Sequence, residues 1–552
     1  MSKSKNRVEI VTVTGLILIF TVLNLWHIIY SWLIRPAGSV FIGISHYHED
    51  YFYYLSQVTQ GALGNWKTEN LFTTEPIGAT LLWWVNIILG KISAFSGLYP
   101  WTVYTIALFV VTIISLLTLY WAALKIFPAN RLLRISSYII SVFSSQYYIL
   151  HRLPSGVIQI NPVDFFYSYT KALNRLGGVV HLILQNILSL AIIVLFGSIL
   201  SDLHQKKTNS RAFIGKVLTV SLFFFMLMFI NPMYVAIDAI CIALVSAWYV
   251  LIRPNRLLQL SKLAYATFVI GVPLLIPLSI ILSAFRNEFY LYFRWAENQV
   301  RPTTPFIFFP SMGLIVPFII LGFVPYLKKG SAIRVLGLFW ALFQIIIYLT
   351  PVPNRLLVPY FRIHQPPAYA FLAAVAAEGM LGISVIISKI IRKLSITTCL
   401  MSLVSIFLFF QLPMLYFEVT DRLHNNAYRT FLQYPSYKLI DGLLFLKSQP
   451  HERNAIAINN LEFLIPAVSG VRVFTAHRSL TWHYGDKIPQ VVAFFYQSMP
   501  PESAWEFLNR NNIGYIIWNN LDGDGTKLAS SYPFLVKLFE NEAVMIYTMS
   551  SM

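Results

Sequence analysis

The sequence predicts a polytopic α-helical membrane protein with about eleven spans, followed by a small C-terminal α/β domain. Three observations predict this fold class. The chain of 552 residues is 57% hydrophobic and only 12% charged, with a mean hydropathy of +0.63, which is too apolar for a water-soluble globule. Apolar runs long enough to cross roughly 30 Å of hydrocarbon recur as far as residue 416. From residue 455 on, the pattern changes to short alternating runs.

The first apolar run, Val8–Leu33, comes after the basic residues Lys3, Lys5 and Arg7. Because it is longer than the core of a signal peptide and lacks a small-residue cleavage site, we expect an uncleaved membrane span at 8–34. The later runs predict ten more spans, at residues 100–124, 135–150, 179–201, 217–231, 233–252, 263–284, 306–327, 335–350, 366–388 and 396–416.

Residues 77–95 form a further apolar run, and the distribution of basic residues indicates whether it crosses. Cytoplasmic loops carry an excess of Lys and Arg. If the N-terminus is cytoplasmic and this run does not cross, five basic clusters all face the cytoplasm: residues 125–134, 206–216, 253–262, 328–334 and 389–393. We therefore interpret the run as a re-entrant or juxtamembrane helix, buried against protein. The external face then carries loops 35–76, 151–178, 285–305 and 351–365 and the tail from about residue 417.

This topology also accounts for the formal net charge of +18, because the basic residues lie in short clusters between spans and form no single patch. We therefore expect no nucleic-acid partner. Cys241 and Cys399 lie far apart inside apolar runs, so the sequence predicts neither a disulfide framework nor a zinc motif.

The sequence divides into a membrane domain, residues 1–416, and an external domain, residues 417–552. The external domain is predicted to contain strand 455–459, helix 461–468, strand 471–474, helix 502–509, strand 515–518 and strand 543–547. Strands that alternate with helices indicate a small α/β domain with a largely parallel sheet. No Gly-rich nucleotide-binding loop comes after its first strand.

The most informative residues are the adjacent acids Glu49 and Asp50, which come after the first span in a chain whose apolar runs contain few charged residues. Acids at a membrane boundary are costly to maintain and are by default a functional-site hypothesis. Neighbours on a helix point about 100° apart, so we expect Asp50 to face a cavity as a catalytic base while Glu49 supports it. The alternative is a solvated acidic pair at a helix start, where the helix dipole favours negative charge.

Three arginines on the predicted external side are candidates to bind a phosphate. Arg175 and Arg362 stand close to the ends of spans, and Arg355 lies in the same loop as Arg362. Guanidinium groups bind phosphate oxygens bidentately and stay charged. The alternative for each arginine is to extend to the lipid headgroups.

Three further residues are candidates to bind substrate. His181 begins a predicted span and could instead satisfy a backbone carbonyl. Asp164 lies in an external loop and could instead cap a helix. His477 lies in a polar, aromatic loop of the external domain, which could close over a cavity or dock the domain.

His46, His48 and Asp50 recur at every second position and, with Glu49, could hold a divalent cation. The alternative is a pair of histidines that make hydrogen bonds at an interface, which such a short pattern favours. The sequence predicts no other cofactor.

The chain resembles the GT-C class of integral membrane glycosyltransferases. The resemblance rests on Glu49-Asp50 in the first external loop, on the segments Gln60-Gly61-x-x-Gly64-x-Trp66 and Glu75-Pro76, and on many spans followed by an external domain. The stretch Ile465–Val473, with His477, Thr481 and Lys487, is similar to the tail of uncharacterised bacterial members.

This resemblance implies a lipid phosphate-linked sugar donor and a catalytic acid in the first external loop, a role that maps onto Asp50 or Glu49. It leads us to expect a hexosyl- or pentosyltransferase of the cell envelope. The enzyme would move a sugar, with inversion, from a polyprenyl phosphate to a glycan, lipid or protein acceptor at the external face. The alternative is a transporter or flippase of lipid-linked saccharides, although the chain shows no paired halves. Either protein would lie in the cell membrane, surrounded by lipid.

Overall fold

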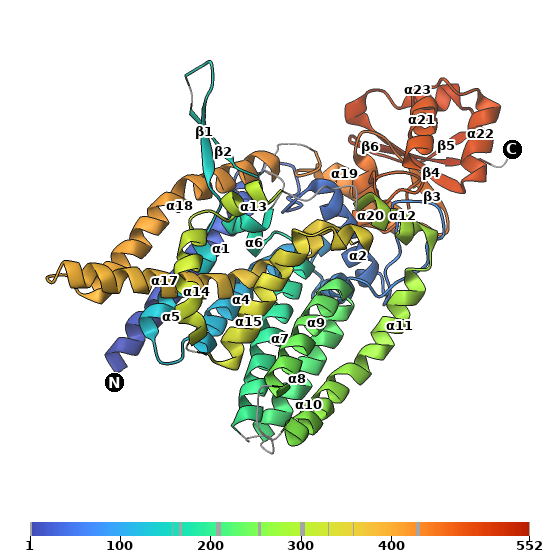
Figure 1. Ribbon diagram of the computed structural model, residues 1–552. Coiled ribbons are helices and arrows are strands. Elements are labelled where there is room, and N and C mark those ends of the chain that lie inside the picture. The colour runs from blue at the N-terminus through green and yellow to red at the C-terminus, as the bar shows by residue number, and fades with distance from the viewer. Residues whose placement is uncertain are drawn as a thin grey trace. The chain divides into compact units, whose positions relative to one another are not determined.

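The computed structural model describes residues 3–156, 158–164, 168–205, 211–251, 256–297, 304–328, 330–356, 358–426 and 431–550 (Figure 1). Several predicted segments lie partly outside these ranges, namely loops 151–178, 285–305 and 351–365, the basic clusters 206–216, 253–262 and 328–334, and the tail. The chain forms two compact units. Unit 1 comprises Met1–Asn24, Phe109–Ile280 and Glu297–Asp421, and unit 2 comprises Leu25–Leu108, Ile281–Ala296 and Arg422–Met552.

Eight helices in the described ranges are long and apolar enough to cross a membrane. They are α1 (Lys3–Leu33), α4 (Pro100–Ile126), α7 (Val180–His204), α8 (Arg211–Met228), α9 (Pro232–Leu251), the run formed by α10 (Arg256–Gly271), η2 (Val272–Leu274) and α11 (Leu275–Ala284), α17 (Tyr369–Ile390) and α18 (Ile396–Asn426). A ninth crossing results if the bent pair α13 (Pro305–Met312) and α14 (Ile315–Lys328) counts as one span.

The other two predicted spans correspond to shorter helices, α5 (Arg131–Phe143) and α15 (Ala332–Tyr348). The 13 residues of α5 extend about 20 Å, which is less than the hydrocarbon thickness. The apolar run continues past this helix, but the chain leaves the helical conformation at Ser144 (φ −55°, ψ 126°), and Ser145 is bound by side chains of α18. Its backbone N–H donates to Gln411 Oε1 (2.7 Å) and its hydroxyl to Glu418 Oε1 (3.0 Å). The run then ends in strand β1 (Tyr148–Arg152), which pairs antiparallel with β2 (Ile158–Pro162).

The two helices α13 and α14 meet at 86°, and Gly313 explains the bend. Its φ of +70° is one that side-chain-bearing residues rarely adopt. A Cβ atom at this position would also collide with the backbone oxygen of Ser145. The bend therefore depends on a residue without a side chain.

Close helix packing holds unit 1 together. A Cβ atom on Gly322 of α14 would collide with the Val375 carbonyl oxygen of α17, so these two backbones touch. Small residues permit such an approach in membrane proteins.

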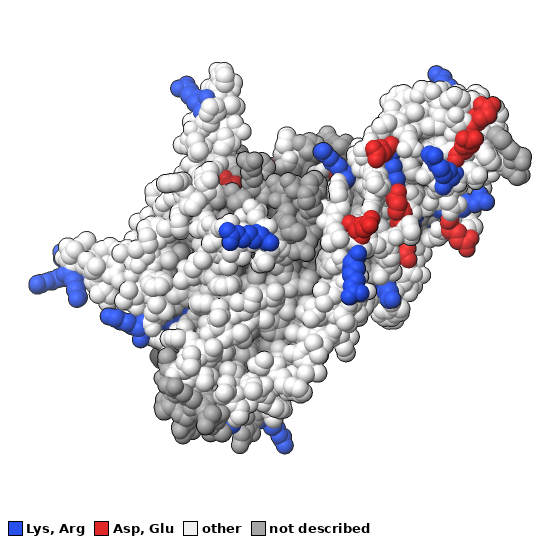
Figure 2. Space-filling model, turned by 45° about the vertical axis from the view of Figure 1, so that its right-hand side comes forward, with Lys and Arg blue, Asp and Glu red and all other residues white. Residues whose placement is uncertain are grey.

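The short elements of this unit are η1 (Ser168–Thr170), α6 (Ala172–Leu176), α16 (Val352–Arg355), η3 (Tyr360–Arg362) and η4 (Pro366–Ala368). In the view of Figure 2, charged side chains are sparse over this helical part, as expected for a surface that faces lipid.

Unit 2 contains a pair of tightly packed helices, α2 (His48–Ala62) and α3 (Trp84–Ser96). The second is the helix that the sequence predicts at 77–95, and its 13 residues are too short for a crossing. A Cβ atom on Gly61 would collide with the Ile87 carbonyl oxygen, so the two helices are in backbone contact.

The C-terminal part of unit 2 is built on a four-stranded sheet in the order β3-β4-β6-β5. Its elements are α19 (Tyr437–Lys447), β3 (Asn454–Ile456), α20 (Leu461–Ser469), α21 (Tyr484–Phe495), α22 (Pro501–Arg510), β4 (Ile513–Asn519), η5 (Asn520–Asp522), α23 (Thr526–Ser531), β5 (Leu535–Glu540) and β6 (Val544–Met549), with α12 (Glu288–Glu297) from the middle of the chain. Phe494 stacks on Tyr532 in its core, at 4.9 Å between ring centroids.

The sequence predicts a largely parallel sheet, and this detail is wrong. Only β3 and β4 pair in parallel, while β4–β6 and β6–β5 are antiparallel. Strands β5 and β6 are joined by a short turn, and such a connection permits only antiparallel pairing. The strand predicted at 471–474 is reduced to a single parallel bridge between Val473 and Ala455.

The first loop after α1 and the C-terminal sheet belong to the same compact unit. The predicted division at 416/417 separates these two segments and stays a prediction. The acidic loop and the C-terminal residues that contact it therefore form one structural region.

Candidate active site

The acidic pair lies in the first turn of α2, where the helix dipole favours negative charge. The Asp50 side chain is 46% exposed and that of Glu49 only 19%. The hydroxyl of Tyr47 donates to Glu49 Oε1 at 2.8 Å. Burial raises the pKa of Tyr47 to about 12, with a further contribution from Glu49, so this hydroxyl keeps its proton at neutral pH. The two neighbouring carboxylates therefore have different surroundings, and the carboxylate of Asp50 is the more accessible to solvent.

His477 contacts the acidic pair. Its Nε2 lies 3.1 Å from Asp50 Oδ1, and its Nδ1 accepts the backbone N–H of Ser479 at 3.0 Å. Glu49 Oε2 is 3.8 Å from Nδ1, beyond hydrogen-bonding distance. The imidazole is 8% exposed. The sequence predicts His477 as a substrate-binding residue, and this assignment stays a prediction.

His477 belongs to residues 471–487, which we call the latch segment, and this segment binds residues 69–75 of the first loop. Backbone contacts link the two: the N–H of Val473 donates to Leu71 O at 2.9 Å. Side-chain contacts reinforce them, since Thr481 donates to Phe72 O at 2.6 Å and Asn70 donates to Leu480 O at 2.7 Å. The first loop is thus fixed by residues about 400 positions later in the chain.

Lys487 adds an ion pair to the contacts between the latch segment and the first loop. Its Nζ lies 2.8 Å from the Glu75 carboxylate and 3.1 Å from the hydroxyl of Thr74. Burial alone would raise the pKa of Glu75, but the hydrogen bonds from Lys487 and Thr73 outweigh it and hold that pKa below its usual value. The ion pair is therefore formed at neutral pH.

Two residues of this region have no recognisable sequence signal. Tyr47 precedes α2 as an ordinary aromatic residue. Glu462, in the first turn of α20, has a buried Oε2 without a hydrogen-bond partner among the described residues. Burial raises the pKa of Glu462 to about 8, and the carboxylates of Asp522 and Glu49 add to this rise. The sequence does not indicate this buried environment, because an acidic residue shortly after two asparagines is typical of an ordinary helix start.

The histidines proposed for a metal lie among aromatic rings. The ring of His46 is 5.7 Å from that of Tyr51, and the ring of His48 is 5.7 Å from that of Phe463. Burial lowers the pKa of His48. Within the described ranges, no three His, Cys, Asp or Glu side chains are placed to hold a metal ion. The divalent cation stays a prediction.

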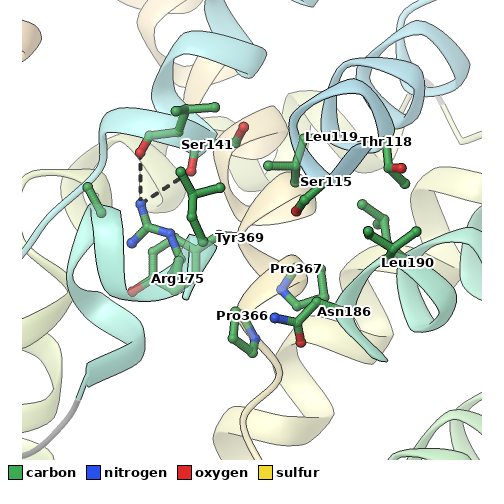
Figure 3. Close-up of a pocket in the computed structure, with 14 residues that line it drawn as sticks. Ser115, Thr118, Leu119, Ser141, Arg175, Asn186, Leu190, Pro366, Pro367 and Tyr369 are labelled. Atoms are coloured by element: carbon green, nitrogen blue, oxygen red, sulfur yellow. Dashed lines mark hydrogen bonds between the residues drawn. The ribbon is translucent and has the colours of Figure 1, made fainter. Parts of the chain in front are cut away.

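In unit 1, Arg175 is buried at the end of α6. Its guanidinium donates to the backbone oxygens of Tyr169 (3.4 Å), Ser141 (3.2 Å), Val142 (3.4 Å) and Ser144, and lies over the ring of Tyr369. Figure 3 shows it on the wall of a small pocket, with two of these bonds directed to backbone oxygens at the end of α5. Arg175 could bind a phosphate only by giving up such contacts.

A carboxylate fixes the other end of α6. Glu418 of α18 accepts the backbone N–H groups of Ala172 (2.9 Å), Leu173 (2.6 Å) and Asn174 (3.3 Å). A carboxylate at a helix start satisfies donors that have no partner within the helix. Glu418 and Arg175 therefore hold α6 from opposite ends.

The remaining predicted substrate-binding residues also lie in unit 1. Arg355 is exposed at the end of α16, and Arg362 lies at the end of η3. His181 is buried in the first turn of α7. Asp164 is buried too, and its backbone exchanges two hydrogen bonds with the side chain of Gln146. Their roles toward a substrate stay predictions.

No family model matches the sequence, and no curated protein is similar to it by sequence. Solved structures are similar. The oligosaccharyltransferase AglB from Archaeoglobus fulgidus, in complex with an inhibitory peptide and a dolichol-phosphate, aligns with a TM-score of 0.53 at 12% identity, over 96% of this chain and 72% of that one. ArnT from Cupriavidus metallidurans, bound to undecaprenyl phosphate, aligns with a TM-score of 0.50 at 12% identity, over 98% and 97%.

The arabinofuranosyltransferase AftD from Mycobacteria aligns with a TM-score of 0.50 at 13% identity, over 98% of this chain and 42% of that one. All three are GT-C glycosyltransferases. The chain has the GT-C fold. Its long apolar helices make the chain a multi-pass membrane protein. Because the identities are this low, the likeness establishes the fold, and the reaction has to be argued from the residues.

Proposed function

We propose that this GT-C protein transfers a sugar from a polyprenyl phosphate donor to an acceptor hydroxyl or amide at the external face of the membrane, with Asp50 as the base. The observation that carries the proposal is the Asp50 carboxylate, which is 46% exposed at the start of α2 and contacts His477. The lipid phosphates bound by AglB and ArnT support a donor of this class.

The reaction is a single displacement. The acceptor atom forms a bond to the anomeric carbon while the bond from that carbon to the phosphate oxygen breaks, and the polyprenyl phosphate leaves with the electron pair. Asp50 takes the proton from the acceptor. Attack opposite the leaving group inverts the anomeric configuration. The departing phosphate needs cations, and we assign Arg362 and Arg355 to this role because guanidinium groups stay charged and bind phosphate oxygens bidentately.

The test uses the purified full-length protein in liposomes with a panel of radiolabelled polyprenyl phosphate sugars and cell-envelope acceptors. Once one donor is found, Asp50→Asn should reduce the transfer rate by about 10²–10⁴-fold and leave donor binding largely intact. Glu49→Gln should cost less, because Glu49 is more enclosed and is held by Tyr47.

The matched control is Asp486→Asn, which removes the same charge from a side chain that is 82% exposed and should keep the parent rate. Parent rates for both Asp50→Asn and Glu49→Gln would overturn the assignment of the acidic pair as the catalytic centre. Movement of the donor between leaflets without sugar transfer would support the transporter or flippase instead.

A further inference from the structure

The protonation of the His477 ring can be deduced from its contacts. A backbone N–H can only donate a hydrogen bond, so the Nδ1 atom that receives the Ser479 N–H at 3.0 Å must carry a lone pair. The proton of the neutral imidazole is then on Nε2, which lies 3.1 Å from Asp50 Oδ1. The ring therefore donates to the carboxylate of Asp50.

Hydrogen bonds fix the backbone turn that carries the His477 ring. The His477 carbonyl accepts the N–H groups of Leu480 (3.1 Å) and Thr481 (2.8 Å). The Thr481 hydroxyl accepts the N–H of Ala476 (3.0 Å) and donates to Phe72 O (2.6 Å). Together with the burial of the imidazole, these bonds leave the ring little freedom to rotate.

We propose that His477 is the positioning residue for the base. The neutral imidazole, supplied by the C-terminal part of the chain, donates from Nε2 to Asp50 Oδ1 and so restricts the rotation of a carboxylate whose side chain is 46% exposed. This inference rests on the proposed function, because it assigns Asp50 the role of base. A base held in one orientation reacts faster than one that rotates, since misplacement of a reacting group by about 1 Å can cost about 10²-fold in rate.

Two amide variants test the roles of the two ring nitrogens of His477 separately. Asparagine places its Oδ1 near the position of Nδ1, so His477→Asn keeps an acceptor for the Ser479 N–H but no longer reaches Asp50. Glutamine places its amide nitrogen near the position of Nε2, so His477→Gln keeps a donor to Asp50. We expect His477→Asn to lower kcat about 10–100-fold with the donor KM near the parent value. We expect His477→Gln to restore most of the lost rate.

The control variant is His483→Asn, which changes an exposed histidine of the same latch segment at a left-handed position that asparagine tolerates. It should keep the parent kcat. The coupling is measured in a double-mutant cycle: in an Asp50→Asn background, His477→Asn should cause little further loss, because the group that it positions is gone.

The outcomes separate this inference from the proposed function. A parent kcat in His477→Asn, with Asp50→Asn still nearly inactive, would overturn the positioning role and leave the base in place. A parent rate in Asp50→Asn would overturn both. An increase in the donor KM at unchanged kcat would make His477 a substrate-binding residue, and increased proteolysis of residues 69–75 in His477→Asn would make it purely structural. Either result contradicts the proposal.

Discussion

Arg175 and Arg362 look equivalent in the sequence, as arginines close to the ends of predicted spans, yet the folded chain places them differently. Arg175 is buried, and its guanidinium donates to four backbone carbonyls. Arg362 lies at the end of a short 3₁₀ helix. The same side-chain type can therefore support the fold at one position and be assigned to the donor phosphate at the other.

Substitution of each arginine by lysine tests this difference. Arg362→Lys keeps the charge but loses the bidentate fork, so its affinity for polyprenyl phosphate should fall about tenfold, as expected for one charge-assisted hydrogen bond of roughly 1.5–3 kcal/mol. Arg175→Lys should lower the thermal unfolding temperature more than the lipid affinity. Lipid binding by fluorescence titration and unfolding by scanning calorimetry distinguish the two, and unchanged lipid affinity in Arg362→Lys would contradict its assignment.

The candidate site was predictable from the sequence only where its residues are adjacent. Glu49 and Asp50 stand out because charge is rare near an apolar span. The partner of Asp50 could not be found in this way, since His477 lies 427 residues further along the chain. The pattern of residues around His477 indicates a polar loop, and no spacing rule connects it to the acidic pair.

At the scale of elements, hydropathy predicted the helices well because burial in lipid requires long apolar runs. It could not detect that Ser145, Gln411 and Glu418 end α5 after 13 residues, because those contacts join distant segments. Strand 543–547 was predicted from its short apolar run, which is buried in β6, whereas β5 was missed because it is mostly exposed and mixes apolar residues with Lys537 and Glu540.

The latch segment should respond to pH through Glu75. Its pKa is lowered in the folded protein, so the Lys487–Glu75 pair contributes stability that is fully present above the unfolded pKa of about 4.3 and is lost as the pH falls through the folded value. Hydrogen exchange of residues 69–75 should be constant from about pH 8 to 5, after correction for the intrinsic exchange rate, and should increase in more acidic buffer.

Glu75→Gln is the control, because it removes the titrating group and should abolish this acid-dependent step while raising exchange at neutral pH. An identical pH profile in the variant and the parent would show that the latch does not depend on this ion pair.

At the scale of the whole molecule, the orientation in the membrane is inferred from the five basic clusters, which all face the cytoplasm when the eleven predicted runs cross and so predict an external C-terminal region. A cysteine in place of Asp524, an exposed residue, should react with an impermeant thiol reagent in intact cells. The two native cysteines are buried and should contribute little background.

Lys393→Cys is the matched control on the predicted cytoplasmic side, and it should react only after the cells are permeabilised. The reverse pattern at both positions would invert the topology, and with it the membrane face that we propose for sugar transfer.

The contacts between the first loop and the latch segment also set the order of events during synthesis. The side chain of Asn70 bonds to a carbonyl 410 residues later. At about 5–20 residues per second, a ribosome needs roughly 20–80 s to make that partner after the loop has emerged. During this interval the first loop exists without the residues that hold it, so a chain that terminates before residue 477 carries Asp50 without its contact to His477. Under the proposed function, sugar transfer therefore requires that synthesis has passed residue 487, the last contact of the latch segment with the first loop.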